Sequence, residues 1–165
     1  MSPDENSGPV IRWPDEFRPD RSPIHVRNEL RMIVAPDLAW AWLIRATRWP
    51  KWYKNAADVR FENGPGPDLT PGAVFRWKTF GVNLVSEVVE FVPGERLAWN
   101  ARGLGVWAYH AWLLRKTDGG CEMITEETQH GIACRVGKLL FPHRMFRWHQ
   151  TWLEELQRQA QTGPP

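Results

Sequence analysis

The fold is decided by residues 72–131, which read GAVFRWKTFGVNLVSEVVEFVPGERLAWNARGLGVWAYHAWLLRKTDGGCEMITEETQHG. This stretch contains five apolar, partly alternating segments separated by turn residues, a pattern that predicts consecutive β-strands. The expected strands are 73–79, 82–92, 95–102, 106–117 and 121–131. Pro93-Gly94 and Asp118-Gly119-Gly120 are typical of hairpin turns, so we expect neighbouring strands to pair in antiparallel fashion.

The chain is rich in rigid aromatic side chains, with 11 Trp among 165 residues. A sheet that carries apolar groups on both faces of several strands needs a large apolar partner. The C-terminal segment offers one, because apolar side chains recur there at helical spacing, which predicts a long amphipathic helix after residue 141. These side chains are Met145, Trp148, Trp152, Leu156 and Ala160. We expect Pro142 in the first turn of this helix and a separate short turn over 135–141.

The segments before residue 72 complete the predicted order of strands and helices. Residues 24–34 alternate between an apolar and a polar face, as in a strand with one dry side. Pro36 suits the first turn of a helix that runs to about Ala46. A second short helix follows Thr47, and a short strand is expected near 58–62.

The two ends of the chain are expected to lie outside the domain at 24–161. Residues 1–23 contain five prolines, which do not sustain a helix or a central strand. We therefore predict an extended arm over 1–23 that rests on the surface through Trp13 and Phe17. Residues 162–165 are expected to form a disordered tail.

Composition favours an ordinary globular protein of one domain. The net charge of +2 gives no global attraction to nucleic acid or to anionic membranes, and no apolar run is long enough for a stable membrane insertion. The acidic, proline-rich N-terminus does not resemble a secretory signal, so we expect a cytoplasmic protein in which Cys121 and Cys134 are free thiols. A nucleic-acid surface over Arg135–Arg147 is disfavoured, because the wider basic footprint of such binders is missing.

Several ordered motifs resemble the START-like helix-grip superfamily (SRPBCC), in its polyketide cyclase/dehydrase and lipid-transport branch. They cover about residues 24–160 and are Val34-Ala35-Pro36, Trp49-Pro50-x-Trp52, Gly72-x-x-Phe75-x-Trp77, Ser86-Glu87-Val88-Val89-Glu90, Pro93-Gly94-Glu95-Arg96-Leu97-Ala98-Trp99, Trp112-x-Leu114 and Trp152-Leu153-x-x-Leu156. The resemblance implies an α+β helix-grip fold: a seven-stranded antiparallel sheet wrapped around a long C-terminal helix, with two short helices after the first strand. It also implies a cavity for apolar molecules, and in some members cyclisation or dehydration. The superfamily has no single catalytic motif to transfer.

The candidate site is the predicted cavity between the sheet and the last helix. Large flat indoles fill space at low entropic cost and stack on rings, although plain core packing is the alternative for each of them. The predicted ligand-binding residues are Trp49, Trp52, Phe75, Trp77, Trp99, Tyr109, His110, Trp112, Glu127, Met145, Trp148 and Trp152. The spacing does not decide whether Trp107 and Tyr109, or His110 and Trp112, face the cavity.

His110 and Glu127 are the candidate catalytic residues, because a carboxylate beside an imidazole can perform acid–base chemistry. They lie on strands that should be hairpin neighbours. The alternative is a solvent-facing cross-strand pair, and a register shift of one residue would put Glu126 in place of Glu127. His143 and His149 do not share a helical face and no third ligand is evident, so we expect no metal and no cofactor.

Two functions remain open from the sequence. The first is the binding of an apolar, ring-containing or lipid-like small molecule in an aromatic-lined cavity. The alternative is a polyketide cyclase/dehydratase-type enzyme that uses the His110–Glu127 pair in the same cavity. The sequence carries no glycine-rich phosphate loop, HExxH or GxSxG motif, which disfavours kinases and the common hydrolases.

Overall fold

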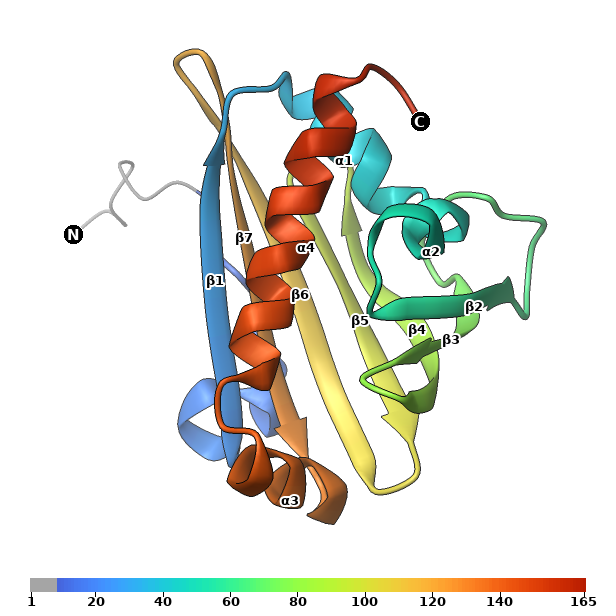
Figure 1. Cartoon of the computed structure of the whole chain (residues 1–165), viewed down its shortest axis with the longest axis vertical. Helices are drawn as coiled ribbons and strands as arrows, with labels where there is room; N and C mark the ends of the chain where they lie inside the picture. Colours follow the sequence, from blue (N-terminus) through green and yellow to red (C-terminus); the bar gives the residue numbers. More distant parts are fainter. Residues whose placement is uncertain (1–8) are drawn as a thin grey trace.

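A sheet of seven antiparallel strands curves around the C-terminal helix in the computed structural model, which describes residues 9–165 (Figure 1). The strands are β1 (Ile24–Met32), β2 (Ala56–Phe61), β3 (Val74–Thr79), β4 (Val82–Val92), β5 (Arg96–Gly103), β6 (Val106–Thr117) and β7 (Gly120–His130). Their order in the sheet is β1-β7-β6-β5-β4-β3-β2. The helices are α1 (Pro36–Ile44), α2 (Trp49–Trp52), α3 (Ile132–Leu140) and α4 (Arg144–Gln161).

This arrangement confirms the predicted helix-grip fold. The strands of the meander begin and end within one residue of the predicted bounds, because hairpin turns mark their ends in the sequence. The two short helices α1 and α2 follow β1 and cover one end of the curved sheet (Figure 1). Between them, Ala46–Arg48 forms a single 3₁₀ turn.

Helix α4 lies along the concave face of the sheet with its apolar stripe inward. Trp152, Leu153, Leu156 and Ala160 are buried there. On the sheet side, Asn28 of β1 donates hydrogen bonds to the Phe146 carbonyl and to the side chain of Gln150. These polar contacts help to set the position of α4 along β1.

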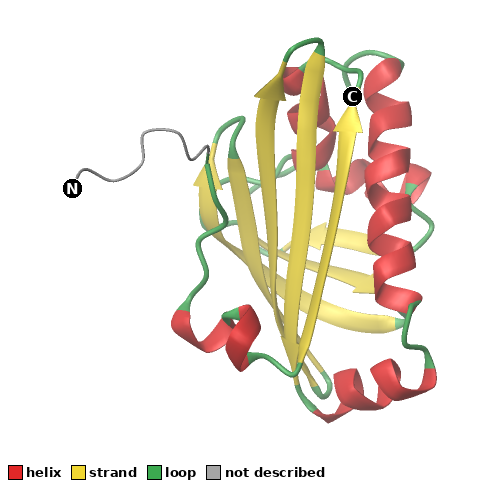
Figure 2. Cartoon of the chain, turned by 90° about the vertical axis from the view of Figure 1, so that its left-hand side faces the viewer, coloured by secondary structure: helices red, strands yellow, loops and turns green. Residues whose placement is uncertain are grey.

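The opposite face of the sheet is covered by the N-terminal arm, of which residues 9–23 are described (Figure 2). Phe17 is only 1% exposed and packs on Trp107 and Tyr109 of β6. The arm forms two 3₁₀ turns, Asp15–Phe17 and Pro19–Arg21, and is tied down where Thr128 donates to the Phe17 carbonyl. This second apolar layer explains why β6 is apolar on both faces.

The structure corrects three local predictions. Residues 132–140 form the helix α3, where a short turn was expected over 135–141. Pro142 lies in the connection before α4, which begins at Arg144, so it is not part of the helix. The tail at 162–165, expected to be disordered, is held against α1 because Trp42 Nε1 donates to the Gly163 carbonyl over 2.7 Å.

Candidate functional site

The middle of the space between sheet and helix is filled by packed indoles. The tryptophan cluster consists of Trp49, Trp77, Trp99, Trp112 and Trp152, and all five are buried. Trp152 of α4 lies at its centre, with ring centroids 5.1 Å from Trp49 and 5.0 Å from Trp112. The edge-to-face contacts are the geometry that aromatic side chains prefer in cores. Much of the predicted cavity is therefore solid core.

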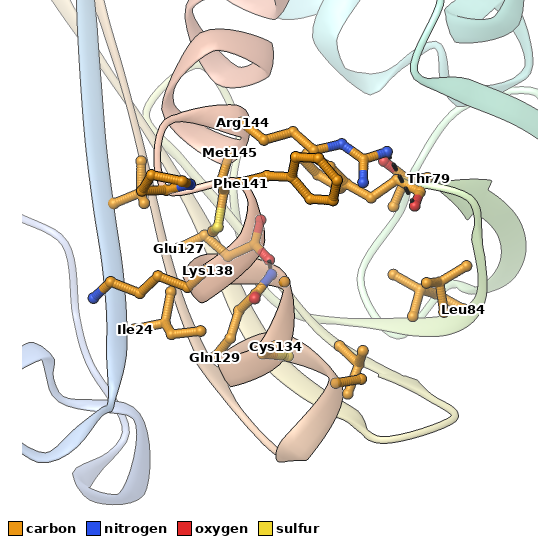
Figure 3. Close-up of a pocket in the computed structure, with 17 residues that line it drawn as sticks. Ile24, Thr79, Leu84, Glu127, Gln129, Cys134, Lys138, Phe141, Arg144 and Met145 are labelled. Carbon is orange, nitrogen blue, oxygen red and sulfur yellow. Dashed lines mark hydrogen bonds between the residues drawn. The ribbon is translucent and has the colours of Figure 1, made fainter.

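An open pocket of about 220 Å³ remains at the end of the barrel that α3 covers, and we call it the α3 pocket (Figure 3). Its walls come from β1, the β3–β4 hairpin, the start of β6, β7, α3 and the start of α4. Ala133, Cys134 and Gly137 of α3 form the cover, and Leu84 lines the opposite side. The lining is mostly apolar; its polar residues are Glu127 and Gln129, which are neighbours on β7, together with Thr79, Lys138 and Arg144.

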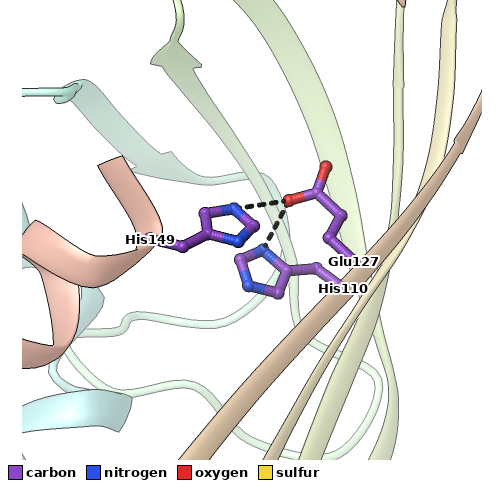
Figure 4. Close-up of side chains that lie close together, drawn as sticks. All are labelled: His110, Glu127 and His149. Atoms are coloured by element: carbon purple, nitrogen blue, oxygen red, sulfur yellow. Dashed lines mark hydrogen bonds and ion pairs between the residues drawn. The ribbon is translucent and has the colours of Figure 1, made fainter. Parts of the chain in front are cut away.

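Beside this pocket, three titratable side chains meet in what we call the His–Glu cluster: His110, Glu127 and His149 (Figure 4). His110 on β6 pairs directly with Glu127 on β7, and both side chains point inward. Glu127 Oε2 lies 3.2 Å from His110 Nδ1 and 3.1 Å from His149 Nε2 of α4. Gln129 donates to Glu127 Oε1 over 2.6 Å.

The cluster borders a second hollow of only about 10 Å³, lined also by Trp99 and Trp152. This volume is close to the minimum for a single water molecule. Glu127 is the member of the cluster that borders both hollows. A ligand in the α3 pocket would therefore meet Glu127 directly, while the two imidazoles lie behind that carboxylate.

Burial controls the charge of this cluster. Burial lowers the pKa of His110 to about 3, more than the attraction of Glu127 raises it, so this imidazole is neutral near pH 7. For Glu127, burial alone would raise the pKa, but His110, His149 and Gln129 together hold it below its usual value. Glu127 is thus a buried carboxylate stabilised by N–H groups, with Thr125 Oγ1 placed 2.7 Å from the remaining nitrogen of His110.

The same three side chains offer two imidazoles and one carboxylate within 4.8 Å, a donor set that occurs at zinc and iron centres. The rings of His110 and His149 are nearly parallel, at 21°, and stack with centroids 4.9 Å apart. Because a ring nitrogen's lone pair lies in the ring plane, stacked rings direct their lone pairs side by side rather than at one ion. The observed arrangement suits hydrogen bonding to the carboxylate better than metal binding.

The structure separates the predicted ligand-binding residues into several groups. Only Glu127 and Met145 line the α3 pocket, whereas the smaller hollow is bordered by Trp77, Trp99, His110, Glu127 and Trp152. Core packing holds the remaining inward side chains, which are Trp49, Trp52, Phe75, Trp112 and the half-buried Trp148. Tyr109 is the clear correction, because it lies on the other face of the sheet under the arm.

The structure also decides between the alternatives for the cross-strand pair of His110 with Glu127 or Glu126. His110 and Glu127 are buried, so they are not a solvent-facing pair. Glu126 points to the other face, where His25 and Arg27 contact its carboxylate.

Sequence reasoning did not bring His149 into this cluster. His149 does not share a helical face with His143, but it follows Met145 by four residues and precedes Trp152 by three, which places it on the inward stripe of the helix. That spacing was the available signal. For α3 the signal was the helical spacing of Ile132, Val136 and Leu139, but that spacing does not show that the opposite, small side chains line a pocket.

Comparisons with known proteins agree with this geometry. Residues 23–161 match the family model described as polyketide cyclase / dehydrase and lipid transport. A hypothetical protein from Helicobacter pylori superposes with a TM-score of 0.87 at 28% identity, covering 95% of this chain and 99% of that one. A search of curated protein sequences finds no match.

Two aromatase/cyclases share the fold at lower identity. The Zhui aromatase/cyclase from a Streptomyces species gives a TM-score of 0.71 at 12% identity, covering 84% of this chain and 93% of that one. The di-domain aromatase/cyclase StfQ of the steffimycin biosynthetic pathway gives 0.68 at 16% identity, covering 84% of this chain and 51% of that one.

The fold, with a pocket between sheet and helices, defines a helix-grip protein. The chain belongs to the polyketide cyclase / dehydrase and lipid transport family, which confirms the resemblance seen in the sequence. Within residues 9–165, no helix combines the length and apolar character that crossing a bilayer requires.

Proposed function

We propose that this protein binds a small, apolar, ring-containing molecule in the α3 pocket. The observation that carries this proposal is a mostly apolar pocket of about 220 Å³ with a buried carboxylate, Glu127, in its wall. A cavity of roughly 150 Å³ accommodates benzene, so this pocket suits one or two fused rings. Apolar burial supplies the affinity, and the few polar groups set the orientation.

Glu127 is suited to anchor a hydroxyl group of such a ligand. Its Oε2 is hydrogen-bonded to His149 and lies 3.2 Å from His110 Nδ1, and its Oε1 accepts from Gln129. A carboxylate has about four acceptor positions, so at least one remains available on the Oε1 side. A hydrogen bond to an ionised group contributes about 1.5–3 kcal/mol, which corresponds to at least about tenfold in affinity.

The test compares 2-naphthol with naphthalene, which differ by one hydroxyl group. We expect both to bind in fluorescence titrations, with 2-naphthol about tenfold tighter. In Glu127→Gln that preference should disappear while naphthalene binding persists, which also shows that the pocket is still formed. An unchanged preference for 2-naphthol in this variant would contradict the anchoring role of Glu127.

A pocket-filling variant provides a second, independent test of the ligand's position. A Cβ added at Gly137 meets no atom within 4 Å, so Gly137→Leu places a side chain in open space at the pocket cover. We expect this variant to lose naphthalene binding. The matched control is Val136→Leu on the outward side of the same helix, which should bind as the wild type does. Binding that survives Gly137→Leu would place the ligand elsewhere.

A polyketide cyclase/dehydratase-type activity is the second candidate. The buried contact between His110 and Glu127 favours it, because paired groups of this type can move a proton. Against this activity, a substrate in the α3 pocket would not reach His110, because His110 borders the small hollow and only Glu127 of this pair lines the α3 pocket. Binding is therefore the better-supported function.

The enzymatic candidate has its own test. With a polyketide-like substrate, His110→Ala should lower turnover by at least about a hundredfold, the usual contribution of a general acid or base. The variant's naphthalene affinity should stay within a few-fold of wild type. Undiminished turnover by His110→Ala would reject this assignment.

A further inference from the structure

Helix α3 presents its apolar side chains to solvent. Ile132, Val136, Leu139 and Leu140 form what we call the α3 outer face. Their spacing of three and four residues places them on one side of the helix, and Ile132 and Leu139 are 79% and 82% exposed. Figure 1 shows α3 at one end of the molecule, beyond the ends of the strands.

The inward side of α3 is formed by small residues. Ala133, Cys134 and Gly137 line the α3 pocket, and Cys134 is the buried residue of this helix. A surface helix of a globular protein normally has the opposite arrangement, with its large apolar side chains toward the core. The large side chains of α3 therefore contribute little to the packing of this domain.

The apolar surface extends beyond the helix. Leu104, in the β5–β6 turn, is exposed and lies next to α3, where the Ala133 amide donates to the Gly105 carbonyl. Phe141, which follows α3 directly, is also exposed. Exposed apolar side chains that gather in one region often mark a binding surface, whereas single exposed ones are common on any protein.

Cations lie close to this patch in the sequence. Arg135, Lys138, Arg144 and Arg147 are exposed, and none of them forms an ion pair within residues 9–165. The sequence contains no Asp or Glu from residue 131 to residue 153. The segment that carries the α3 outer face is thus basic, with no acidic residue of its own.

We propose that the α3 outer face is a docking surface for an anionic lipid bilayer. Short amphipathic helices bind bilayers by placing apolar side chains among the acyl chains while neighbouring cations contact anionic headgroups. A nucleic acid would use the cations but leave the leucines in water. A second copy of the chain docked through the same face would bring its four cations toward the four of the first copy. The bilayer matches both the apolar centre and the basic surroundings.

Docking would place the cover of the α3 pocket against the lipid. The inner residues of α3 line the pocket and its outer residues would enter the bilayer interface, so one nine-residue helix separates the two environments. The surface proposal does not depend on the pocket ligand, because the four residues of the α3 outer face do not line the pocket; Lys138, Phe141 and Arg144 are exposed but also border it.

The experiment is co-sedimentation of the whole chain with vesicles of phosphatidylcholine, with and without phosphatidylserine. We expect binding to the anionic vesicles, weak binding to the neutral ones, and a decline as salt is added. Leu139→Ser should weaken binding by at least about tenfold, since one exposed leucine no longer enters the apolar layer. Arg135→Gln should weaken it by about fivefold.

Ile33→Ser is the matched control. Ile33 is 84% exposed, as Leu139 is, but it follows β1 at the end of the molecule opposite α3 (Figure 1). This variant should bind vesicles as the wild type does. Equal losses from Ile33→Ser and Leu139→Ser would overturn the proposal, as would no binding to anionic vesicles. A dimer dissolved by Leu139→Ser without vesicle binding would also overturn it and assign the face to a second copy.

Discussion

His110 should make the stability of this protein depend on pH in a range where most proteins are little affected. Burial lowers its pKa from 6.5 to about 3 in the folded state. Below pH 6.5 the unfolded chain binds a proton at this residue that the folded chain does not bind. The free energy of unfolding therefore falls as the pH decreases from 6.5 toward 3.

The size of the effect follows from the two pKa values. A pH of about 5 lies roughly 1.5 units below the pKa of the imidazole in the unfolded chain. The free energy of unfolding is therefore lower by about 2 kcal/mol, at ~1.4 kcal/mol per unit. The same loss follows for any folded-state pKa of His110 well below 5. Glu127 acts in a lower range: its depressed pKa contributes stability that is present above 4.5 and is lost as the pH falls through the folded value.

The assay is urea unfolding, followed by tryptophan fluorescence at a series of pH values from about 8 to about 5. His110→Gln removes the titrating ring, so its free energy of unfolding should lose about 2 kcal/mol less than that of the wild type over this range. The change with pH is the readout, because the substitution also alters packing against Trp99 and Trp112.

His143→Gln serves as the control, since it replaces an exposed imidazole before α4. It should keep the wild-type pH dependence. If His110→Gln and the wild type lose equal stability between these pH values, the folded protein does not hold His110 neutral and the reasoning fails.

Four further results are expected. Phe17→Ala should lower the free energy of unfolding by about 3 kcal/mol, because its buried ring joins the arm to the sheet; a urea-measured loss below about 1 kcal/mol would contradict this role. Gly137→Leu should raise it by up to about 1 kcal/mol through helix propensity, and a destabilised variant would show that the pocket cover has no room. Zinc should leave the unfolding temperature unchanged, since the stacked imidazoles do not converge on one ion; a rise that a chelator reverses would contradict this. Burial raises the pKa of Cys134 to about 11, so in a Cys121→Ser background its reaction with maleimide at neutral pH should be about a hundredfold slower than that of an exposed thiol, and a fast reaction would contradict its burial.

Much of the fold was predictable because local patterns specify it. Turn residues such as Pro93-Gly94 limit each strand, and the spacing of Trp152 and Leu156 defines the inward stripe of the last helix. Helix α3 was not predicted, although Ile132, Val136 and Leu139 recur at helical spacing; what the pattern does not encode is that this apolar stripe faces solvent. The arm over β6 was only partly predictable, since nothing in residues 9–23 specifies which face they cover.

The site depended on contacts that periodicity does not encode. Alternation places His110 and Trp112 on one face of β6 and Tyr109 on the other, but both faces are apolar and the pattern alone does not rank them. The His–Glu cluster needs α4 to lie at one position along β7 before His149 meets Glu127. The pocket exists because the tryptophans fill only part of the barrel.

The sequence by itself determined the antiparallel meander, the final helix and the family, because turn chemistry and side-chain alternation act over a few neighbouring residues. The tertiary structure alone decided which side chains line open space and which fill the core. That outcome depends on the volumes and positions of side chains from distant segments, such as Trp49, Trp99 and Trp152, which meet only after the sheet has curved around the helix.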